Sequence, residues 1–233
     1  MTSIKYFYSA SVMDYGTGRY WHKYYKFPKL TRVTKTITLK PKLGIPFAVI
    51  KFGNSVWNKV GLHNIGFKKF YLDILPELIL FVNPKDLIIS LAGTDDDIDD
   101  MVWVIDRGKI PVGGIELNFS CPNVEDQKNR EVPKSKYPIY LKLNYLQDPY
   151  EYNLDNVTGI RLNSIPSYMG GVSGKAAQKY NWEFIDRYGR DGINIAGCSF
   201  TNRDDIKRLE DMGCTEMGIG SVILTNPKFV EQL

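Results

Sequence analysis

Short runs of alternating or continuous apolar residues recur along the chain and predict eight β-strands. The runs lie at residues 7–12, 31–38, 87–93, 113–120, 139–144, 157–164, 192–197 and 215–222. Helical patterns separate several of them, and alternation of strand and helix favours parallel pairing of the strands. Eight parallel strands are the number that a closed (β/α)8 barrel needs, so the sequence predicts an α/β fold of the TIM-barrel type.

Three helices are predicted from apolar residues that recur at intervals of three and four positions. The first covers residues 95–106, with Thr94 as its cap and acidic residues in its first turn that oppose the helix dipole. The second covers about 176–188, and the third begins at Thr201, with Asp204 three residues later as in a capping box. Their inward-facing residues are expected to be Ile98, Met101, Val102 and Ile105, then Ala177, Phe184, Ile185 and Tyr188, then Ile206 and Leu209.

Two connections are too short for full crossover helices. About twenty residues separate the strand ending near Ser120 from the one beginning near Ile139, and about a dozen separate Asn144 from Val157. The first connection is charged and contains Pro133, and the second is rich in Tyr, Asp and Asn, which is typical of loops or single turns. We therefore expect residues 1–233 to form a single barrel domain with shortened or missing helices after strands four and five.

The composition excludes several classes of protein. With 43% hydrophobic and 24% charged residues, the 233 residues suffice for one sizeable core. The net charge of +4 is spread along the chain without an arginine-rich arm, so no nucleic-acid partner is expected. The sequence has no apolar run of about 18 residues and no signal-peptide core, so no membrane span is expected. Cys121, Cys198 and Cys214 match neither a disulfide framework nor a zinc site, so we expect no metal and a reducing cytoplasm.

The chemistry of the chain centres on residues 115–123, Ile-Glu-Leu-Asn-Phe-Ser-Cys-Pro-Asn, where a strand runs directly into a polar turn. Barrel enzymes carry their catalytic groups at the carboxyl ends of strands. Asn118 and Asn123 would flank the thiol of Cys121 there. The stretch resembles the active-site turn of dihydroorotate dehydrogenases. Other segments match that family in the same order: 34–39, 58–67, 163–164 with 170–174, and 218–221.

The resemblance implies an oxidoreductase of pyrimidine biosynthesis, which oxidises (S)-dihydroorotate to orotate with FMN as cofactor. Cys121 matches the general base of the soluble class 1 enzymes, and hydride would pass to N5 of the flavin. Membrane-associated relatives have serine at that position and an amino-terminal helical extension, which we do not expect in this protein. A thiolate can act as a base if its neighbours lower its pKa. The plainer alternative is a small buried cysteine at the barrel rim.

The resemblance also implies the remaining site residues. The residues matched to substrate binding are Lys35, Asn58, Gly61, Leu62, Asn118, Asn123, Asn163 and Ser164. The residues matched to FMN binding are Ala10, Ser11, Lys35, Thr36, Lys142, Gly171, Gly197, Cys198, Gly220 and Ser221. Lys142 matches the lysine that stabilises the negative charge of the reduced flavin. Taken singly, each asparagine or glycine is explained equally well as a turn residue, and each lysine as a solvent-exposed strand residue.

Two departures from the family pattern keep other functions open. The family has a Gly-Gly pair after strand seven, where this chain reads Gly197-Cys198, and the loop after Cys121 is shortened. The alternatives are a flavin oxidoreductase acting on another cyclic imide such as dihydrouracil, or a non-catalytic, structural barrel subunit. The electron acceptor would be fumarate or a partner electron-transfer subunit. Any iron–sulfur cluster would lie on that partner, because three cysteines cannot bind a four-cysteine cluster. A homodimer is a further expectation.

Overall fold

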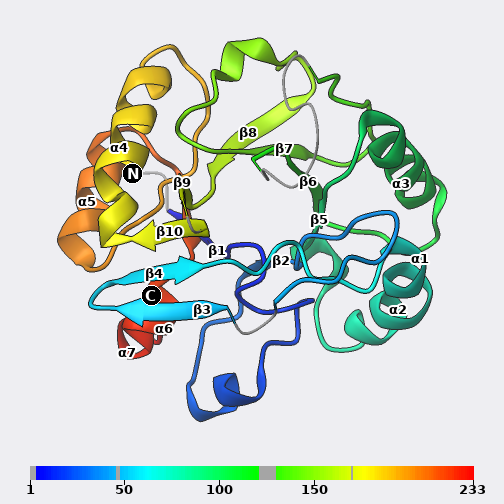
Figure 1. The fold of residues 1–233 in the computed structure, drawn as a ribbon, viewed down its shortest axis with the longest axis horizontal. Coiled ribbons are helices and arrows are strands. Elements are labelled where there is room, and N and C mark those ends of the chain that lie inside the picture. Colours follow the sequence, from blue (N-terminus) through cyan, green and yellow to red (C-terminus); the bar gives the residue numbers. More distant parts are fainter. Residues whose placement is uncertain (1–3, 46–47, 121–129, 169) are drawn as a thin grey trace.

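The fold is built on a sheet of parallel strands that curls into a barrel, as the sequence predicts (Figure 1). The computed structural model describes residues 4–45, 48–120, 130–168 and 170–233. Seven strands pair in the order β11-β1-β2-β5-β6-β7-β8. They are β1 (Lys5–Tyr8), β2 (Thr31–Val33), β5 (Leu87–Leu91), β6 (Gly114–Asn118), β7 (Ile139–Leu143), β8 (Val157–Leu162) and β11 (Glu216–Ile219).

The barrel closes through the segment predicted as the seventh strand, residues 192–197. It pairs with its neighbours only through isolated bridges, Ile195 to Ile160 on one side and Gly197 to Met217 on the other. The N–H of Ala196 donates to the carbonyl of Ile160 at 2.9 Å, and the carbonyl of Gly197 accepts from Gly218 at 2.8 Å. The bridges complete the eight-membered ring of a (β/α)8 barrel.

Alternation along the strands separates an apolar outer face from a polar interior. In β6, Ile115 and Leu117 join the hydrophobic cluster that includes Met101 of α3. Glu116 and Asn118 point to the opposite face of the strand and are also buried. The main core therefore lies between the barrel and its helices, whereas the barrel interior holds buried polar groups.

Seven α-helices occur in the described part of the chain. They are α1 (Phe67–Lys69), α2 (Leu75–Leu78), α3 (Asp95–Arg107), α4 (Lys175–Gly189), α5 (Arg203–Asp211), α6 (Val222–Thr225) and α7 (Pro227–Val230), with a π-helical turn at Phe70–Ile74 between α1 and α2. Their ten predicted inward-facing residues are all buried. None of these helices is long and apolar enough to span a membrane.

Two predicted caps have different outcomes. The Thr94 side chain accepts from the N–H of Asp97 at 3.2 Å, and Asp97 accepts from the Thr94 N–H at 3.3 Å, which confirms the start of α3. The predicted start of α5 at Thr201 is wrong, because Asn202 is the cap and accepts from the N–H of Asp205 at 2.9 Å. Thr201 instead donates its hydroxyl to the Asp205 carboxylate at 2.8 Å.

The connections after β6 and β7 contain no α-helix within the described residues, as expected. Residues 130–138 are irregular, and the connection after β7 has a single 3-10 turn at Pro149–Glu151. Similar turns occur at Tyr20–Tyr24 and Pro84–Asp86.

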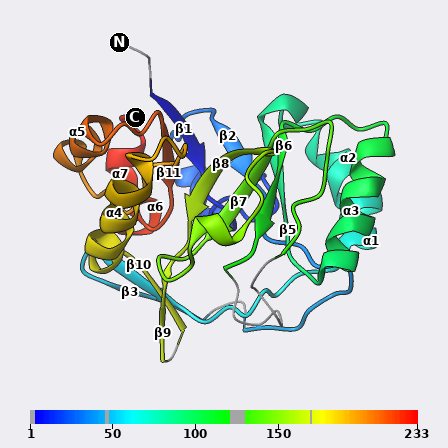
Figure 2. The same cartoon turned by 90° about the horizontal axis from the view of Figure 1, so that it is seen from above.

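A second, antiparallel sheet was not predicted. It consists of β3 (Val49–Phe52), β4 (Ser55–Asn58), β10 (Gly170–Gly174) and β9 (Ile165–Ser167), in the order β3-β4-β10-β9. Figure 2 shows it at the end of the molecule opposite the start of β1, which is the end where the parallel strands finish. The predicted run 31–38 was too long, because β2 ends at Val33. The predicted run 215–222 was also too long, because β11 ends at Ile219 and α6 begins at Val222.

Candidate functional site

Two of the predicted site residues, Cys121 and Asn123, lie outside the described residues. The two predicted lysines are described, and both are buried, with 9% of Lys35 and 8% of Lys142 exposed. These values exclude the explanation that either lysine simply faces solvent. Lys142 lies in β7 directly beside Asn118 of β6, whereas Lys35 follows the end of β2 and is not in a strand.

Three predicted residues that lie at or just beyond the carboxyl ends of different strands are joined by hydrogen bonds through Ser120. Asn163 donates its side-chain amide to Ser120 at 2.7 Å, and Ser120 donates to the amide oxygen of Asn118, also at 2.7 Å. Asn118 in turn donates to the Thr36 hydroxyl at 3.2 Å. The structure thus brings together residues that are more than one hundred positions apart in the sequence.

A buried carboxylate lies beneath this polar group. Glu116 is 1% exposed and lies 3.7 Å from the ammonium of Lys142 and 3.5 Å from the guanidinium of Arg161. It accepts a hydrogen bond from the Ser90 hydroxyl at 2.9 Å. A buried carboxylate needs such partners, because an unpaired charge is strongly disfavoured away from water.

Lys35 has a carboxylate neighbour of its own. Its ammonium lies 3.9 Å from the carboxylate of Asp14, and its backbone N–H donates to the Asp14 carbonyl at 2.7 Å. Burial lowers the pKa of Lys35, and the nearby Asp14 carboxylate offsets part of that shift. The lysine therefore places a cation close to the polar end of the barrel.

Asn58, Ser164 and Gly171 meet where the antiparallel sheet lies against the end of β8. Gly171 pairs with Asn58 across the sheet, and the Asn58 side chain donates to the Gly171 carbonyl at 3.4 Å. A β-carbon on Gly171 would lie 2.5 Å from the hydroxyl oxygen of Ser164. Glycine is therefore required here by close approach. Gly171, predicted to bind FMN, thus lies directly beside the predicted substrate residues Asn58 and Ser164.

Gly61 and Leu62 form a tight turn with left-handed backbone angles, φ of 68° and 59°. Asn64 was not predicted as a site residue, yet its side chain donates to the Leu62 carbonyl at 2.7 Å and accepts from the Gly66 N–H at 2.8 Å. It also donates to the Thr38 hydroxyl at 2.9 Å. Asn64 therefore fixes the turn that carries Gly61 and Leu62.

The late turns contain backbone donors suited to a phosphate group. In the part of the chain that the structure describes, the N–H groups of Cys198, Gly220 and Ser221 have no protein partner. The N–H of Gly197 is engaged by the carbonyl of Glu216 at 2.8 Å, so this glycine is not itself a donor. A β-carbon on Gly174 would lie 3.0 Å from the Ser221 hydroxyl oxygen, which places the start of α4 beside the same turn.

Side chains from α4 support the turn that departs from the family pattern. Ser199 has a left-handed φ of 60°, and its hydroxyl accepts from Asn181 at 2.9 Å. The indole of Trp182 donates to the carbonyl of Cys198 at 2.9 Å. The Gly197-Cys198 sequence is therefore held in a defined conformation, and its Cys198 N–H remains a possible phosphate donor.

Ala10 and Ser11 follow β1 on the same side of the barrel. Ala10 packs against the small cluster formed by Phe7, Val33, Ile88 and Ala196. Ser11 has a left-handed φ of 69° and forms an isolated bridge with Asp14, the residue that lies beside Lys35. The turn after β1 is thereby connected to the Lys35 side of the site.

Cys198 and Cys214 are unsuited to act as bases. Burial raises the pKa of the Cys198 thiol to about 12 and that of Cys214 to about 11, so both are protonated at neutral pH. Both are free thiols. Neither Cys198 nor Cys214 is therefore suited to the role of general base that is predicted for Cys121.

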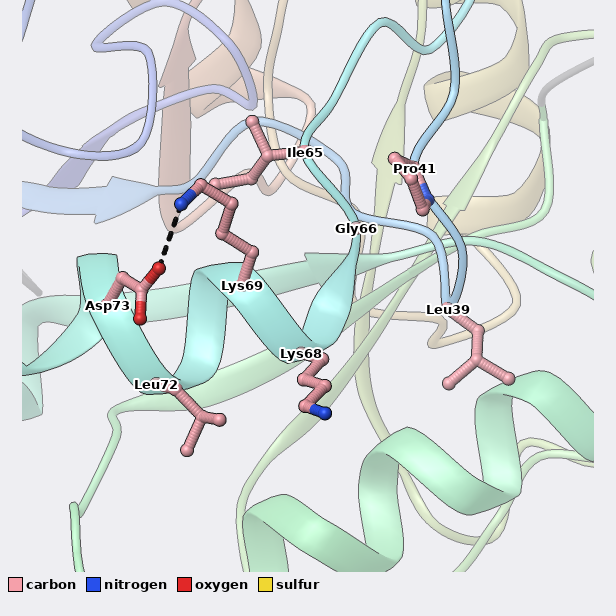
Figure 3. Close-up of a pocket in the computed structure, with 8 residues that line it drawn as sticks. All are labelled: Leu39, Pro41, Ile65, Gly66, Lys68, Lys69, Leu72 and Asp73. Atoms are coloured by element: carbon pink, nitrogen blue, oxygen red, sulfur yellow. Dashed lines mark hydrogen bonds and ion pairs between the residues drawn. The ribbon is translucent and has the colours of Figure 1, made fainter.

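Two surface grooves lie away from these residues. One, of about 380 Å³, is bordered by Leu39 and by the helical segment that carries the Lys69–Asp73 ion pair (Figure 3). The other, of about 790 Å³, lies between α3 and residues 130–134. Neither groove is lined by a predicted site residue, so neither changes the location of the candidate site.

Comparison with known proteins agrees with this geometry. The family model for dihydroorotate dehydrogenase matches residues 6–141, more than half of the chain. The chain belongs to the dihydroorotate dehydrogenase family. The matched region includes the strand that carries Glu116 and Asn118, the turn at Gly61 and Leu62, and Lys35.

Bacterial members of the family are similar over part of the sequence. The catalytic subunit of dihydroorotate dehydrogenase B (NAD(+)) from Listeria welshimeri is 37% identical over 114 residues, which cover 48% of this chain and 36% of the relative. The corresponding subunit from Desulforudis audaxviator is 40% identical over 96 residues, covering 40% of this chain and 30% of the relative. The chain thus matches about a third of the length of these dihydroorotate dehydrogenases.

Solved structures of the family share the barrel. Ligand-free DHODH from Eimeria tenella superposes with a TM-score of 0.68 at 13% identity, covering 99% of this chain and 84% of that one. The same enzyme in complex with ferulenol gives a TM-score of 0.70 at 13% identity, covering 97% and 78%. At this identity the likeness establishes the fold alone.

Proposed function

We propose that this protein is an FMN-dependent dihydroorotate dehydrogenase of class 1, which oxidises (S)-dihydroorotate to orotate. The observation that carries the proposal is the hydrogen-bonded group of Thr36, Asn118 and Asn163 at the carboxyl ends of the strands, with buried Lys142 beside Asn118. Membership of the family supports the same reaction.

The polar groups match the chemistry of the proposed substrate. Dihydroorotate has a planar imide edge and a carboxylate. The amides of Asn58, Asn118, Asn123 and Asn163 would bind the ring, with Ser164 beside them, because an amide offers both donors and acceptors. The turn of Gly61 and Leu62 would approach the carboxylate, and the Lys35 ammonium would add a positive charge nearby.

The residues present also suit FMN. When bound, FMN would accept the hydride removed from the substrate. Lys142 would place its positive charge beside the flavin ring, and the N–H groups of Cys198, Gly220 and Ser221 would bind the phosphate. The other residues assigned to this site are Ala10, Ser11, Lys35, Thr36, Gly171 and Gly197.

Cys121 would remove the proton that accompanies hydride loss. Buried neutral thiols at Cys198 and Cys214 leave it as the chain's candidate cysteine base. A Cys121→Ala variant should retain FMN but lose reduction by dihydroorotate, and Cys121→Ser should restore part of it at higher pH. Equal reduction rates in wild type and Cys121→Ala would contradict the assignment.

The similar bacterial proteins support one type of electron acceptor over another. Their names describe catalytic subunits of an NAD(+)-linked enzyme, so a separate electron-transfer subunit would re-oxidise the flavin. Fumarate is the alternative acceptor. The two are distinguished by adding fumarate to the reduced protein, since re-oxidation without any partner would favour fumarate. We place the protein in the cytoplasm and propose a homodimer as its assembly.

The first experiment is to purify the protein and follow its visible absorption near ~450 nm while dihydroorotate is added without oxygen. Loss of the band would support both FMN and the substrate. Bleaching by dihydrouracil but not by dihydroorotate would favour another cyclic imide. A folded, colourless protein that takes up no FMN would instead favour a non-catalytic barrel.

A further inference from the structure

The hydrogen bonds inside the barrel run in one direction, toward Glu116. The Ser90 hydroxyl donates to Glu116 at 2.9 Å, and a serine hydroxyl has only one proton to give. The contact of 2.9 Å between the hydroxyls of Ser90 and Thr36 must therefore have Thr36 as its donor. Thr36 in turn accepts from the side-chain amide of Asn118 at 3.2 Å.

The same direction continues to the end of β8. Ser120 donates to the amide oxygen of Asn118 at 2.7 Å and accepts from the amide nitrogen of Asn163 at 2.7 Å. Ser164 donates to the amide oxygen of Asn163 at 3.4 Å. The series of hydrogen bonds thus begins at the Ser164 hydroxyl and ends at Glu116. Each of the other hydroxyls in the series accepts one hydrogen bond and donates one.

The carboxylate is what sets this direction. An ionised carboxylate can only accept, whereas every other member of the chain can both donate and accept. Arg161 and Lys142, which can only donate, lie 3.5 and 3.7 Å from the Glu116 oxygens, so Glu116 faces them as an acceptor. With Glu116 fixed as an acceptor, reversal of any one amide would place two donors or two acceptors face to face.

We propose that Glu116 is a positioning residue that determines which way round Asn118 and Asn163 present their amides to the ligand. Among the described residues, these hydrogen bonds use one N–H and one oxygen lone pair of each amide. The second N–H and the second lone pair of each amide remain available to a ligand. A flipped amide would exchange donor for acceptor at the ring. The identity of the ligand rests on the proposed function, but the orientation of the amides does not.

Ser90→Ala tests the inference without removing any charge. Thr36 then loses its acceptor, and among the described residues its hydroxyl proton can be satisfied by the oxygen of a flipped Asn118. Ser120 and Asn163 should reverse in turn. In the ligand-free protein, nuclear Overhauser effects from the Asn118 amide protons should move from the Thr36 methyl group to the Ser120 β-protons. Glu116→Gln, which can donate as well as accept, should give a mixture of both patterns.

Ser135→Ala is the matched control, because it also removes a serine hydroxyl that donates to a carboxylate, that of Asp106 at 2.7 Å. It should leave both asparagine patterns unchanged. If Ser90→Ala is folded and its asparagine amides keep the wild-type pattern, the inference is wrong. The same result in Glu116→Gln would exclude a role for the carboxylate.

Binding of orotate tests the ligand separately. Ser90→Ala should raise the Kd for orotate about ten-fold, since a misdirected amide leaves polar groups of the ring unpaired. Ser135→Ala should bind like wild type. If the amides reverse but wild type binds no orotate, the positioning role is supported and the proposed function fails. If orotate binds equally to all variants although the amides reverse, the amides do not face the ring and the inference is overturned.

Discussion

The ammonium of Lys142 lies 3.7 Å from the Glu116 carboxylate, and both side chains are buried in the barrel. Arg161 lies on the other carboxylate oxygen at 3.5 Å. Glu116 therefore lies between two cations, one from β7 and one from β8.

If Lys142 lies beside the flavin as proposed, Lys142→Met should make the reduction potential of bound FMN more negative, because a fixed positive charge is removed. The shift would be roughly 30 mV for each 1.4 kcal/mol of lost stabilisation. An anaerobic potentiometric titration measures it. Lys179→Met is the control, since Lys179 is exposed and pairs with Glu183 on α4 at 4.0 Å. Identical potentials in Lys142→Met and wild type would contradict a role beside the flavin.

Arg161→Met should destabilise the fold by about 3–5 kcal/mol, because it leaves buried Glu116 with less compensation. The guanidinium also lies 4.0 Å from the ring centre of Phe7 and 3.8 Å from that of Tyr140. Urea unfolding measures the change. Arg190→Met, which removes an exposed i,i+4 ion pair with Asp186, should lose less than about 1 kcal/mol. Equal losses of unfolding free energy in the two variants would show that the buried ion pair stabilises the fold no more than the exposed one.

His22 should make stability fall between pH 6.5 and about 4. Burial, with smaller effects from Arg19 and Arg32, lowers the pKa of His22 from 6.5 to about 4. The unfolded chain therefore binds the proton more readily, so the contribution is full above pH 6.5 and is lost as pH falls toward 4. His22→Asn keeps an acceptor for the Arg19 N–H, which His22 accepts at 2.6 Å. In this variant the drop in unfolding free energy from pH 7 to pH 5 should shrink by roughly 2 kcal/mol. An unchanged drop would mean that His22 is not buried as a neutral ring.

Gly171→Ala should weaken orotate binding and lower stability, because its β-carbon would lie 2.5 Å from the Ser164 hydroxyl oxygen. We expect a loss of about 1–3 kcal/mol in unfolding free energy. Ser164→Gly should rescue much of it by removing the clashing atoms, which a double-mutant cycle measures. Gly189→Ala at the end of α4 is the control, since the nearest atom to its β-carbon is 4.0 Å away. Without rescue, the loss would have another origin.

The sequence predicts the barrel well because its evidence is local. The barrel strands show their alternation within a few residues, and the helices α3 and α4 show their period within a few turns. The cap at Thr94 depends on residues three positions apart. The antiparallel sheet could not be found in this way. Its central pairing joins Asn58 of β4 to Gly171 of β10, and the residue pattern of neither short strand indicates which strand it pairs with.

The candidate site was predicted unevenly for a similar reason. Family motifs predicted site roles for Lys35, Asn118, Lys142 and Asn163, and the structure brings these four residues to the same end of the barrel. Alternation in β6 places Glu116 on the same face as Asn118, but it does not show that Ser90, Ser120 and Arg161 lie across from it. Those contacts depend on the register of other strands.

The antiparallel sheet also has a consequence for how the protein folds and opens. Its two hairpins are excursions from the barrel, inserted after β2 and after β8, and they can pair only after the barrel has brought their ends together. Closure of so long a stretch of chain is entropically unfavourable until other contacts support it. We expect this sheet to form late and to exchange its amide hydrogens before the barrel does. Asn58 and Gly171 would then belong to the least persistent part of the fold, so a ligand that binds there would slow local opening without altering the barrel.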